Sequence, residues 1–192
     1  MKFFFLRHTS LDVGPDVFYG QTNLDVSSSF ESELNLIKKK ISKDLQNIKE
    51  FKVYSSPLKR CLKLAKRISD EVETDSRIKE LNLGNWEMKP KSQIPKDLVT
   101  KWEKDIMNFQ IPGGETNAEF LSRLKEFIDE LISKNSDVLI VAHAGSINGM
   151  IANLTGERFD KLLKNYWEKI GYGSLSLIEG KSSSFKIKFI GK

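Results

Sequence analysis

An apolar run near the N-terminus, Phe-Phe-Phe-Leu at residues 3–6, is followed at once by Arg7 and His8. Four consecutive bulky apolar residues are typical of a strand that is covered on both faces, as in parallel sheets with helices on either side. Such sheets bind ligands beyond the carboxyl ends of their strands. The run therefore predicts a strand over residues 2–6 that delivers a cation and an imidazole to a ligand-binding crevice.

Strand and helix patterns alternate along the rest of the chain. Apolar runs predict strands at 51–55 and 138–142, and residues 174–179 and 185–190 predict a hairpin at a sheet edge with a turn at 180–183. Helical spacing of apolar residues predicts helices over 30–48, 58–68, 120–132 and 147–154, and residues 96–107 leave room for another. We expect an α/β fold with a mostly parallel sheet and an antiparallel edge, in a single domain over residues 1–192.

Short polar motifs mark where three of these helices begin. Ser28 and Glu31 have the spacing of a capping box, as do Thr116 and Glu119. The dipeptide at 56–57, Ser-Pro, predicts an N-cap followed by proline in the first helical turn.

Composition excludes several classes of protein. Hydrophobic residues make up 39% and charged residues 30% of the 192, and no run approaches the ~20 apolar residues that cross a membrane. The single cysteine, Cys61, cannot form an internal disulfide, so a cytoplasmic location is expected. The net charge of +5 permits a nucleic-acid partner, but the lysines are scattered along predicted helices and no zinc-finger or aromatic-basic pattern is present. We expect no nucleic-acid and no membrane partner.

The only two histidines, His8 and His143, each follow a predicted strand. A lone histidine is more often a hydrogen-bonded structural residue, but two at strand ends, beside a cation or a helix start, favour a functional site. A neutral imidazole is a competent nucleophile toward phosphorus, and arginines such as Arg7 and Arg60 suit the phosphoryl oxygens. Such chemistry also needs a proton donor, which spacing alone does not select.

Five blocks in order resemble the histidine phosphatase superfamily, also called phosphoglycerate-mutase-like. They are Leu-Arg-His-Thr at 6–9, Tyr-Ser-Ser-Pro-Leu-Lys-Arg at 54–60, the stretch 77–87 with Glu-Leu-Asn-Leu-Gly at 80–84, Pro-Gly-Gly-Glu-Thr at 112–116, and Val-Ala-His-Ala-Gly at 141–145. The resemblance extends from residue 2 to about residue 155 and implies a three-layer αβα sandwich.

The resemblance also implies roles for individual residues. His8 matches the nucleophile that becomes phosphorylated, Arg7, Arg60 and His143 match the phosphate pocket, and Glu80 matches the proton donor that later activates water. The family needs no metal, and no cofactor is expected. Without the resemblance, Glu80 and Arg60 would be interpreted as surface residues of a loop and a helix.

Two departures from the family pattern affect the phosphate contacts. The common Arg-His-Gly-Glu opening is Arg-His-Thr-Ser here, and Gly14 stands where an asparagine is often found. The candidates for replacing those contacts lie in the following loop and are Thr9, Gly20, Gln21 and Thr22. Ala144 and Gly145, at the start of the predicted helix after His143, are further substrate-binding candidates through their backbone amides.

The short connection between the Glu80 block and His143 favours a phosphatase over a mutase, because mutases of the superfamily carry longer insertions there. The opening and the loop at 19–23 are similar to the α-ribazole phosphatase branch. We therefore expect a phosphomonoesterase for α-ribazole-5'-phosphate in cobalamin biosynthesis. The alternatives are a broad sugar-phosphate or nucleotide phosphatase, a phosphoglycerate mutase-type phosphotransferase and a non-enzymatic phosphate-binding module. The expected partner is a phosphorylated small molecule, and the oligomeric state is open.

Overall fold

The apolar run near the N-terminus forms strand β1 (Lys2–Arg7) at the centre of a six-stranded sheet in the computed structural model, which describes residues 1–45, 47–166, 168–181 and 184–192. The strand order is β4-β3-β6-β1-β7-β8. Strands β4, β3, β6 and β1 are parallel, whereas β7 is antiparallel to both β1 and β8. The predicted fold class, a mostly parallel sheet with an antiparallel edge, is confirmed.

The other strands are β2 (Val17–Phe18), β3 (Lys52–Ser55), β4 (Glu73–Thr74), β5 (Lys89–Pro90), β6 (Val138–Ala142), β7 (Leu175–Lys181) and β8 (Ser184–Phe189). The helices are α1 (Phe30–Leu45), α2 (Lys59–Lys66), α3 (Lys96–Lys104), α4 (Asn117–Lys134), α5 (Ala144–Thr155) and α6 (Phe159–Tyr166). Short 3₁₀ turns occupy η1 (Ile48–Glu50), η2 (Ser76–Ile78), η3 (Gly84–Trp86) and η4 (Lys91–Gln93).

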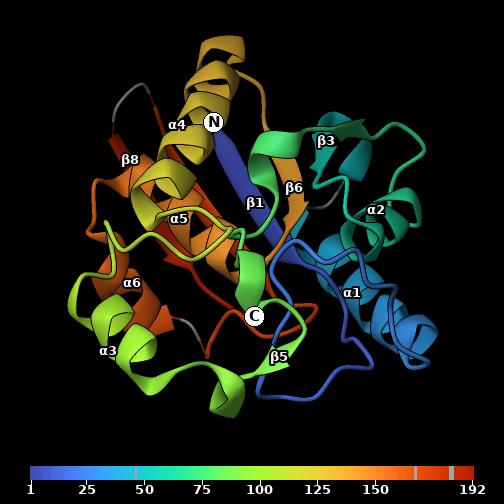
Figure 1. The fold of residues 1–192 in the computed structure, drawn as a ribbon. Coiled ribbons are helices and arrows are strands. Elements are labelled where there is room, and N and C mark those ends of the chain that lie inside the picture. Colours follow the sequence, from blue (N-terminus) through green and yellow to red (C-terminus); the bar gives the residue numbers. More distant parts are fainter. Residues whose placement is uncertain (46, 167, 182–183) are drawn as a thin grey trace.

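Alternating side chains of β1 supply both faces of the sheet. Phe3 and Phe5 pack with residues of α4, α5 and α6, whereas Phe4 and Leu6 pack with residues of α1 and α2. Figure 1 shows the two groups of helices on opposite sides of the sheet. Successive side chains of a strand point to opposite faces of the sheet, so four consecutive apolar residues are buried only if helices cover both faces. The sheet and its two helical layers hold the carboxyl ends of β1, β3 and β6 at one edge.

A smaller apolar cluster lies outside the two main layers. Leu83, Trp86, Ile94 and Ile111 are buried together, with Phe18 packed against them. Strands β2 and β5 form a separate two-stranded sheet that pairs the loop after β1 with the stretch around residue 90. The segment of weak pattern near residues 84–111 therefore has its own core and is attached to the loop that follows His8.

The structure changes several local predictions. Helix α1 ends at Leu45, and Ile48 belongs to η1, where Asn47 accepts a hydrogen bond from Lys49 N and favours a new start over continuation. Residue 46, within the predicted helix, and residues 182–183, within the predicted turn of the C-terminal hairpin, lie outside the described residues. The hairpin strands themselves are present as β7 and β8.

The caps differ from the prediction at two of three helices. The capping box of Thr116 and Glu119 is confirmed at α4. The predicted capping box of Ser28 and Glu31 is not formed, because the carboxylate of Glu31 accepts from Arg67. Leu58 occupies the N-cap position of α2 without a capping side-chain hydrogen bond, whereas the Ser56 hydroxyl accepts from the N–H of Leu58 (3.4 Å) and also contacts His143.

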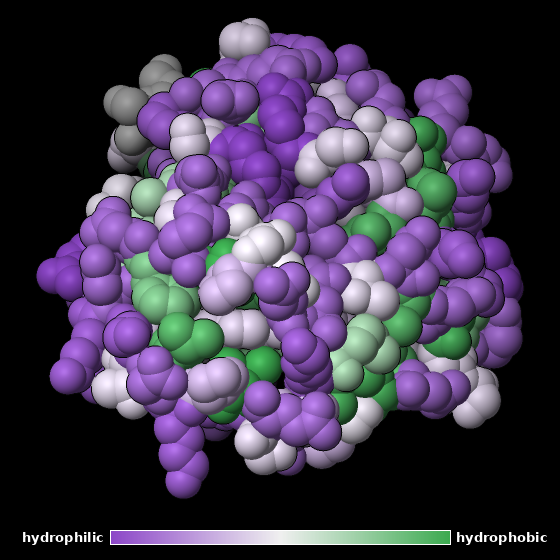
Figure 2. All heavy atoms as spheres, in the orientation of Figure 1, coloured by the Kyte–Doolittle hydropathy of each residue, from purple (hydrophilic) through white to green (hydrophobic). Residues whose placement is uncertain are grey.

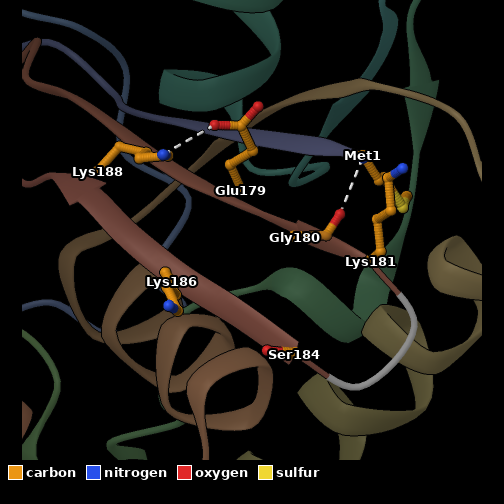
Figure 3. Close-up of a pocket in the computed structure, with 7 residues that line it drawn as sticks. All are labelled: Met1, Glu179, Gly180, Lys181, Ser184, Lys186 and Lys188. Carbon is orange, nitrogen blue, oxygen red and sulfur yellow. Dashed lines mark hydrogen bonds and ion pairs between the residues drawn. The ribbon is translucent and has the colours of Figure 1, made fainter.

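On the face of the molecule shown in Figure 2, hydrophilic side chains predominate, with smaller hydrophobic areas between them. Among the described residues, no helix has both the length and the apolar character that crossing a bilayer requires. A shallow hollow of about 280 Å³ lies beside Met1 and the β7–β8 hairpin, where Lys188 pairs with Glu179 (Figure 3). It lies at the start of β1, at the opposite end of this strand from His8.

Candidate active site

The ends of two neighbouring strands, β1 and β6, bring the two histidines together. His8 follows β1 and its backbone N–H donates to the carbonyl of Ala142 at the end of β6 (3.1 Å). His143 comes directly after β6 and precedes α5. The two imidazole rings lie edge to face with centroids 5.2 Å apart, and both side chains are buried. The parallel pairing of β1 with β6 thus brings together two histidines that are 135 positions apart in the sequence.

His8 is held in one tautomer by its own strand end. Its Nδ1 lies 2.7 Å from the carbonyl oxygen of Thr9, which can only accept, so Nδ1 carries the proton. The other nitrogen, Nε2, then has the free lone pair, and it is buried without a hydrogen-bond partner among the described residues. An oriented, neutral imidazole with an unpartnered nitrogen is the form that a nucleophile requires.

Arg60 lies in the first turn of α2, is fully buried and contacts the imidazole of His143. Its Nε donates to Nδ1 of His143 (3.2 Å), and its two terminal nitrogens donate to the carbonyls of Thr22 (2.8 Å) and Gly20 (2.7 Å). Because Nδ1 of His143 accepts, its Nε2 carries the proton and donates to the hydroxyl of Ser56 (2.9 Å). Arg60 therefore fixes the second histidine and the loop after β1 at once.

Arg7 lies on the other side of His8, in contact with the chain between α6 and β7. It donates to the carbonyl of Ile170 (2.7 Å) and to the hydroxyl of Tyr19 (3.5 Å), and its guanidinium stacks on the ring of Tyr172 at 4.0 Å. Its Nε is buried without a partner in the described chain. Like Arg60, it forms no ion pair with a carboxylate of a described residue, so the site carries two uncompensated positive charges.

Burial and these charges keep both imidazoles neutral. Burial is the main cause that holds the pKa of His8 well below its ordinary value, and the guanidinium groups of Arg60 and Arg7 add to it. Burial likewise lowers the pKa of His143, helped by Arg60 and by His8 itself. Cys61, which donates to the carbonyl of Ala142 beneath His143 (3.4 Å), has its pKa raised by burial and stays a thiol.

Glu80 lies at the N-terminus of α5. One carboxylate oxygen accepts from the backbone N–H of Gly145 (2.9 Å), and the other accepts from that of Leu81 (2.9 Å). A Cβ atom on residue 145 would lie 3.0 Å from the carboxyl carbon of Glu80 and closer still to its oxygen, so only glycine allows this approach. The start of α5 thus holds a carboxyl group at the same sheet edge as His143.

Two further ionic side chains fix the segment that carries Glu80. Arg123 of α4 donates to three main-chain carbonyls of this segment, including that of Glu80 (2.9 Å). Arg123 also pairs with Glu115 (2.6 Å), which accepts from the backbone N–H of Asn82 (2.7 Å). Both side chains of this pair are largely buried, so it orders the main chain on either side of Glu80.

Glu87 ties the loop after β1 to the same segment. One of its oxygens accepts from the backbone N–H groups of Gln21 (2.8 Å) and Leu83 (3.2 Å), and the other accepts from the hydroxyl of Thr22 (2.5 Å). The side-chain amide of Gln21 donates to the carbonyl of Glu80 (3.0 Å). The loop after β1 and the segment that carries Glu80 are therefore joined by one network of hydrogen bonds.

The predicted substrate-binding residues fall into two groups. Thr9 is buried and its hydroxyl has no partner among the described residues, so it is available to a ligand. Gly20 and Thr22 offer their carbonyls to Arg60, and the polar side-chain groups of Gln21 and Thr22 are engaged within the protein. These loop residues shape the site through the main chain in this structure, and direct contact with a substrate remains a prediction.

Ala144 and Gly145, the other two predicted substrate-binding residues, lie at the start of α5. Ala144 is the first residue of the helix, and the N–H of Gly145 is occupied by Glu80. Among the described residues, no group of three or more His, Cys, Asp or Glu side chains is arranged to hold a metal ion.

Sequence reasoning missed Ser56, Glu87 and Tyr172 as parts of the site. Ser56 has the spacing of a helix cap, yet its hydroxyl is the partner of His143. Tyr172 follows no strand end and no motif, and only the packing of the chain between α6 and β7 brings it to Arg7. Glu87 ends the third block of the family pattern, residues 77–87, so its position was visible in the sequence but its hydrogen bonds were not.

Comparison with known proteins identifies the family. The sequence model of the histidine phosphatase superfamily, branch 1, matches residues 3–192, and the chain belongs to this superfamily. Phosphoserine phosphatase 1 of Hydrogenobacter thermophilus is 24% identical over 198 residues, covering 97% of this chain and 92% of that protein. Glucosyl-3-phosphoglycerate phosphatase of Mycobacterium tuberculosis is 25% identical over 161 residues, covering 71% of this chain and 72% of that protein.

Solved structures show the same fold. The α-ribazole phosphatase of Shigella flexneri superposes with a TM-score of 0.84 at 20% sequence identity, covering 100% of this chain and 96% of that one. The relatives named as phosphatases support phosphatase chemistry for this chain.

The buried histidines predict a pH dependence of stability. Both have a folded-state pKa below the value of about 6.5 in the unfolded chain, so below that pH the unfolded state binds more protons. The free energy of unfolding is therefore greatest above about pH 6.5. It decreases as the pH is lowered below that value, by at most about 1.4 kcal/mol per pH unit for each histidine. Urea unfolding between about pH 7.5 and about pH 5.5 measures this slope. His8→Asn and His143→Asn should each flatten it, and wild-type slopes in both variants would contradict the assignment.

Gly145→Ala should act through Glu80. The added Cβ displaces the carboxyl group, so phosphate-ester hydrolysis should fall about as far as in Glu80→Gln, with the thermal midpoint of unfolding little changed. In the Glu80→Gln background, the same substitution should have little further effect on hydrolysis, because its target is already lost. Multiplicative losses in the double variant would show that Gly145 serves the reaction by another route.

Proposed function

We propose that this protein is a phosphomonoesterase that hydrolyses phosphate esters of small molecules through a phosphohistidine formed on His8. The observation that carries the proposal is the state of that side chain. Its Nδ1 proton is held by the Thr9 carbonyl, its Nε2 lone pair is buried and free, and two arginines without carboxylate partners flank it. A positive, buried pocket with a neutral nucleophile suits a phosphate dianion.

In the first step, Nε2 of His8 attacks the phosphorus atom and the bond to the leaving oxygen breaks. Arg7 and Arg60 stabilise the charge on the phosphoryl oxygens, with the unpartnered Nε of Arg7 and hydroxyl of Thr9 as further donors. His143 contributes when a phosphoryl oxygen replaces the Ser56 hydroxyl as the acceptor of its Nε2 proton. Glu80 in its protonated form donates the proton that the departing alcohol needs. The products of this step are the free alcohol and the phosphorylated His8.

In the second step, water attacks the phosphorus of the phosphohistidine. The carboxylate of Glu80 accepts the proton of the water, the P–N bond breaks and inorganic phosphate leaves. The neutral Nε2 is restored, which the low pKa of His8 favours. All the groups needed are side chains of this chain, so we propose a metal-independent reaction carried out by a single domain over residues 1–192.

Two substrate classes have separate support. The Arg-His-Thr opening and the loop at 19–23 favour α-ribazole-5'-phosphate, which would place the protein in cobalamin biosynthesis. The phosphoserine phosphatase that spans nearly the whole chain favours O-phosphoserine. Broader sugar-phosphate or nucleotide hydrolysis is the remaining phosphatase alternative, because specificity depends on the groups around the leaving alcohol rather than on the phosphate pocket.

A panel of phosphorylated metabolites that contains α-ribazole-5'-phosphate, O-phosphoserine, sugar phosphates and nucleotides tests the proposal when assayed with EDTA present. We expect release of inorganic phosphate from at least one of them, undiminished by EDTA and absent in His8→Ala, which should retain its circular dichroism spectrum. A mutase would require a bisphosphate primer and return an isomer, and a phosphate-binding module would bind phosphate without turnover. Hydrolysis that survives in His8→Ala would remove His8 as nucleophile.

Glu80→Gln should separate esters by their leaving groups. An alkyl phosphate needs a proton at the leaving oxygen, so its hydrolysis should fall by about 10²–10⁴-fold, whereas formation of the phosphohistidine from an aryl phosphate should fall much less. Single-turnover release of the alcohol or phenol measures this step. Equal losses for the two esters would exclude Glu80 as the acid.

A further inference from the structure

The phosphate pocket is closed in this structure. His8 has 1% of its surface exposed, and Arg60, His143 and Thr9 are buried as completely. A phosphate ester cannot reach Nε2 of His8 past such a cover, because the attacking and accepting atoms must come to within about 3–3.5 Å. At least one side chain over the pocket has to move before a substrate binds.

Two tyrosines form that cover. The ring of Tyr172 lies 5.5 Å from the ring of His8 and stacks on the guanidinium of Arg7 at 4.0 Å. The hydroxyl of Tyr172 lies 3.3 Å from that of Tyr19, which accepts from Arg7 and whose ring lies beneath Arg60 at 5.2 Å. Burial raises the pKa of Tyr19, so this hydroxyl stays a neutral hydrogen-bonding group.

Tyr172 is the more exposed of the two. It is 41% exposed although it touches a buried histidine and a partly buried arginine. It stands between two glycines, and Gly173 has a φ of +63° that most residues avoid. The main chain is held beside both tyrosines, because the carbonyl of Gly20 accepts from Arg60 (2.7 Å) and the N–H of Gly173 donates to the carbonyl of His8 (3.1 Å). Opening of the pocket therefore requires rotation of the exposed Tyr172 side chain about its own bonds, whereas the ring of Tyr19 is more enclosed.

We propose that Tyr172, closing against Tyr19, is a specificity-determining gate over the phosphate pocket. It opens to admit a phosphate monoester and lies against the leaving group when the phosphoryl group is bound. This inference rests on the proposed phosphatase function and extends it to the selection of the ester.

The position of the gate explains why it would act on the leaving group. The groups that surround a phosphoryl group at His8 are buried, so the leaving alcohol must extend outward, toward the part of the site that reaches solvent. That part is formed by the two tyrosines. A side chain that limits the room there discriminates by leaving-group size, and filling or emptying such a space changes selectivity by about 10–200-fold.

The closed gate also occupies Arg7. Its guanidinium stacks on Tyr172 and donates to Tyr19, and these contacts must yield when phosphoryl oxygens arrive. The anion offers a stronger, charge-assisted partner, so binding of substrate and opening of the gate are coupled. A wholly structural tyrosine would show no such exchange.

Orthovanadate provides a probe of the gate that does not depend on turnover. In stopped-flow fluorescence, the observed rate of vanadate binding to the wild-type protein should level off as vanadate is increased, because opening becomes limiting. In Tyr172→Ala, the rate should rise by about tenfold or more and lose this plateau. Tyr172→Phe keeps the ring on Arg7 and loses only the hydroxyl contact, so a plateau should persist.

Selectivity is the second readout. The ratio of kcat/KM for 1-naphthyl phosphate to that for O-phosphoserine should rise by about tenfold or more in Tyr172→Ala and return to within about twofold of wild type in Tyr172→Phe. Leu36→Ala, which removes an exposed apolar side chain from α1, is the matched control and should change neither readout. An active Tyr172→Ala with wild-type vanadate rates and a wild-type ratio would overturn the gate.

The two readouts separate the gate from the proposed function. If the wild-type protein hydrolyses no ester, the phosphatase proposal fails, and the vanadate rates still decide whether Tyr172 limits entry. If esters are hydrolysed but vanadate binding shows no plateau and is unchanged in Tyr172→Ala, the gate fails and the phosphatase stands.

Discussion

The site depends on one constraint, a guanidinium that is buried without a carboxylate partner in the described part of the chain. Arg60 is fully enclosed, and its donors are met by two main-chain carbonyls and one imidazole, which satisfy hydrogen bonds but not charge. A buried charge is costly unless it is paired, so an anion bound beside Arg60 would stabilise this arrangement. Arg7 adds a second such charge at the end of the neighbouring strand.

The same two charges determine the state of the histidines. Together with burial, they hold the pKa of both imidazoles down, and the Thr9 carbonyl decides which nitrogen of His8 is left bare. In the proposed mechanism, the positive charge that would bind a phosphate therefore also favours the unprotonated form of His8. The carboxyl group of Glu80 is held by the backbone N–H groups of Gly145 and Leu81, and it forms no ion pair with a described residue.

Much of the fold follows from pattern, because apolar periodicity reports burial directly. The doubly covered β1 and β6, the helices on both faces and the C-terminal hairpin were all predictable. The pattern was incomplete where other hydrogen bonds compete. The Ser56 hydroxyl accepts from the N–H of Leu58 before α2 but also contacts His143, and η1 interrupts a continuous apolar stripe. Strands β2 and β5 have two residues each, too few for any period to show.

The site was predictable only in part, for a related reason. His8, His143 and Arg60 follow or adjoin strand ends, so a parallel sheet brings them together whatever the loops do. Glu80 could be singled out only by family resemblance, since its position depends on contacts with Gly145 and Arg123 that are distant in sequence. Tyr172 carries no local signal, and its approach to Arg7 depends on tertiary packing alone.

Trapping the phosphorylated protein tests most directly whether His8 carries the phosphoryl group. Glu80→Gln, mixed with an aryl phosphate and quenched in alkali on the millisecond scale, should yield a peptide with one phosphoryl group on His8, because the leaving group departs readily while attack by water is slowed. Peptide mass spectrometry locates the group. Hydrolysis of the ester by the wild-type protein with no phosphoryl group ever found on His8 would contradict the nucleophilic role of this residue.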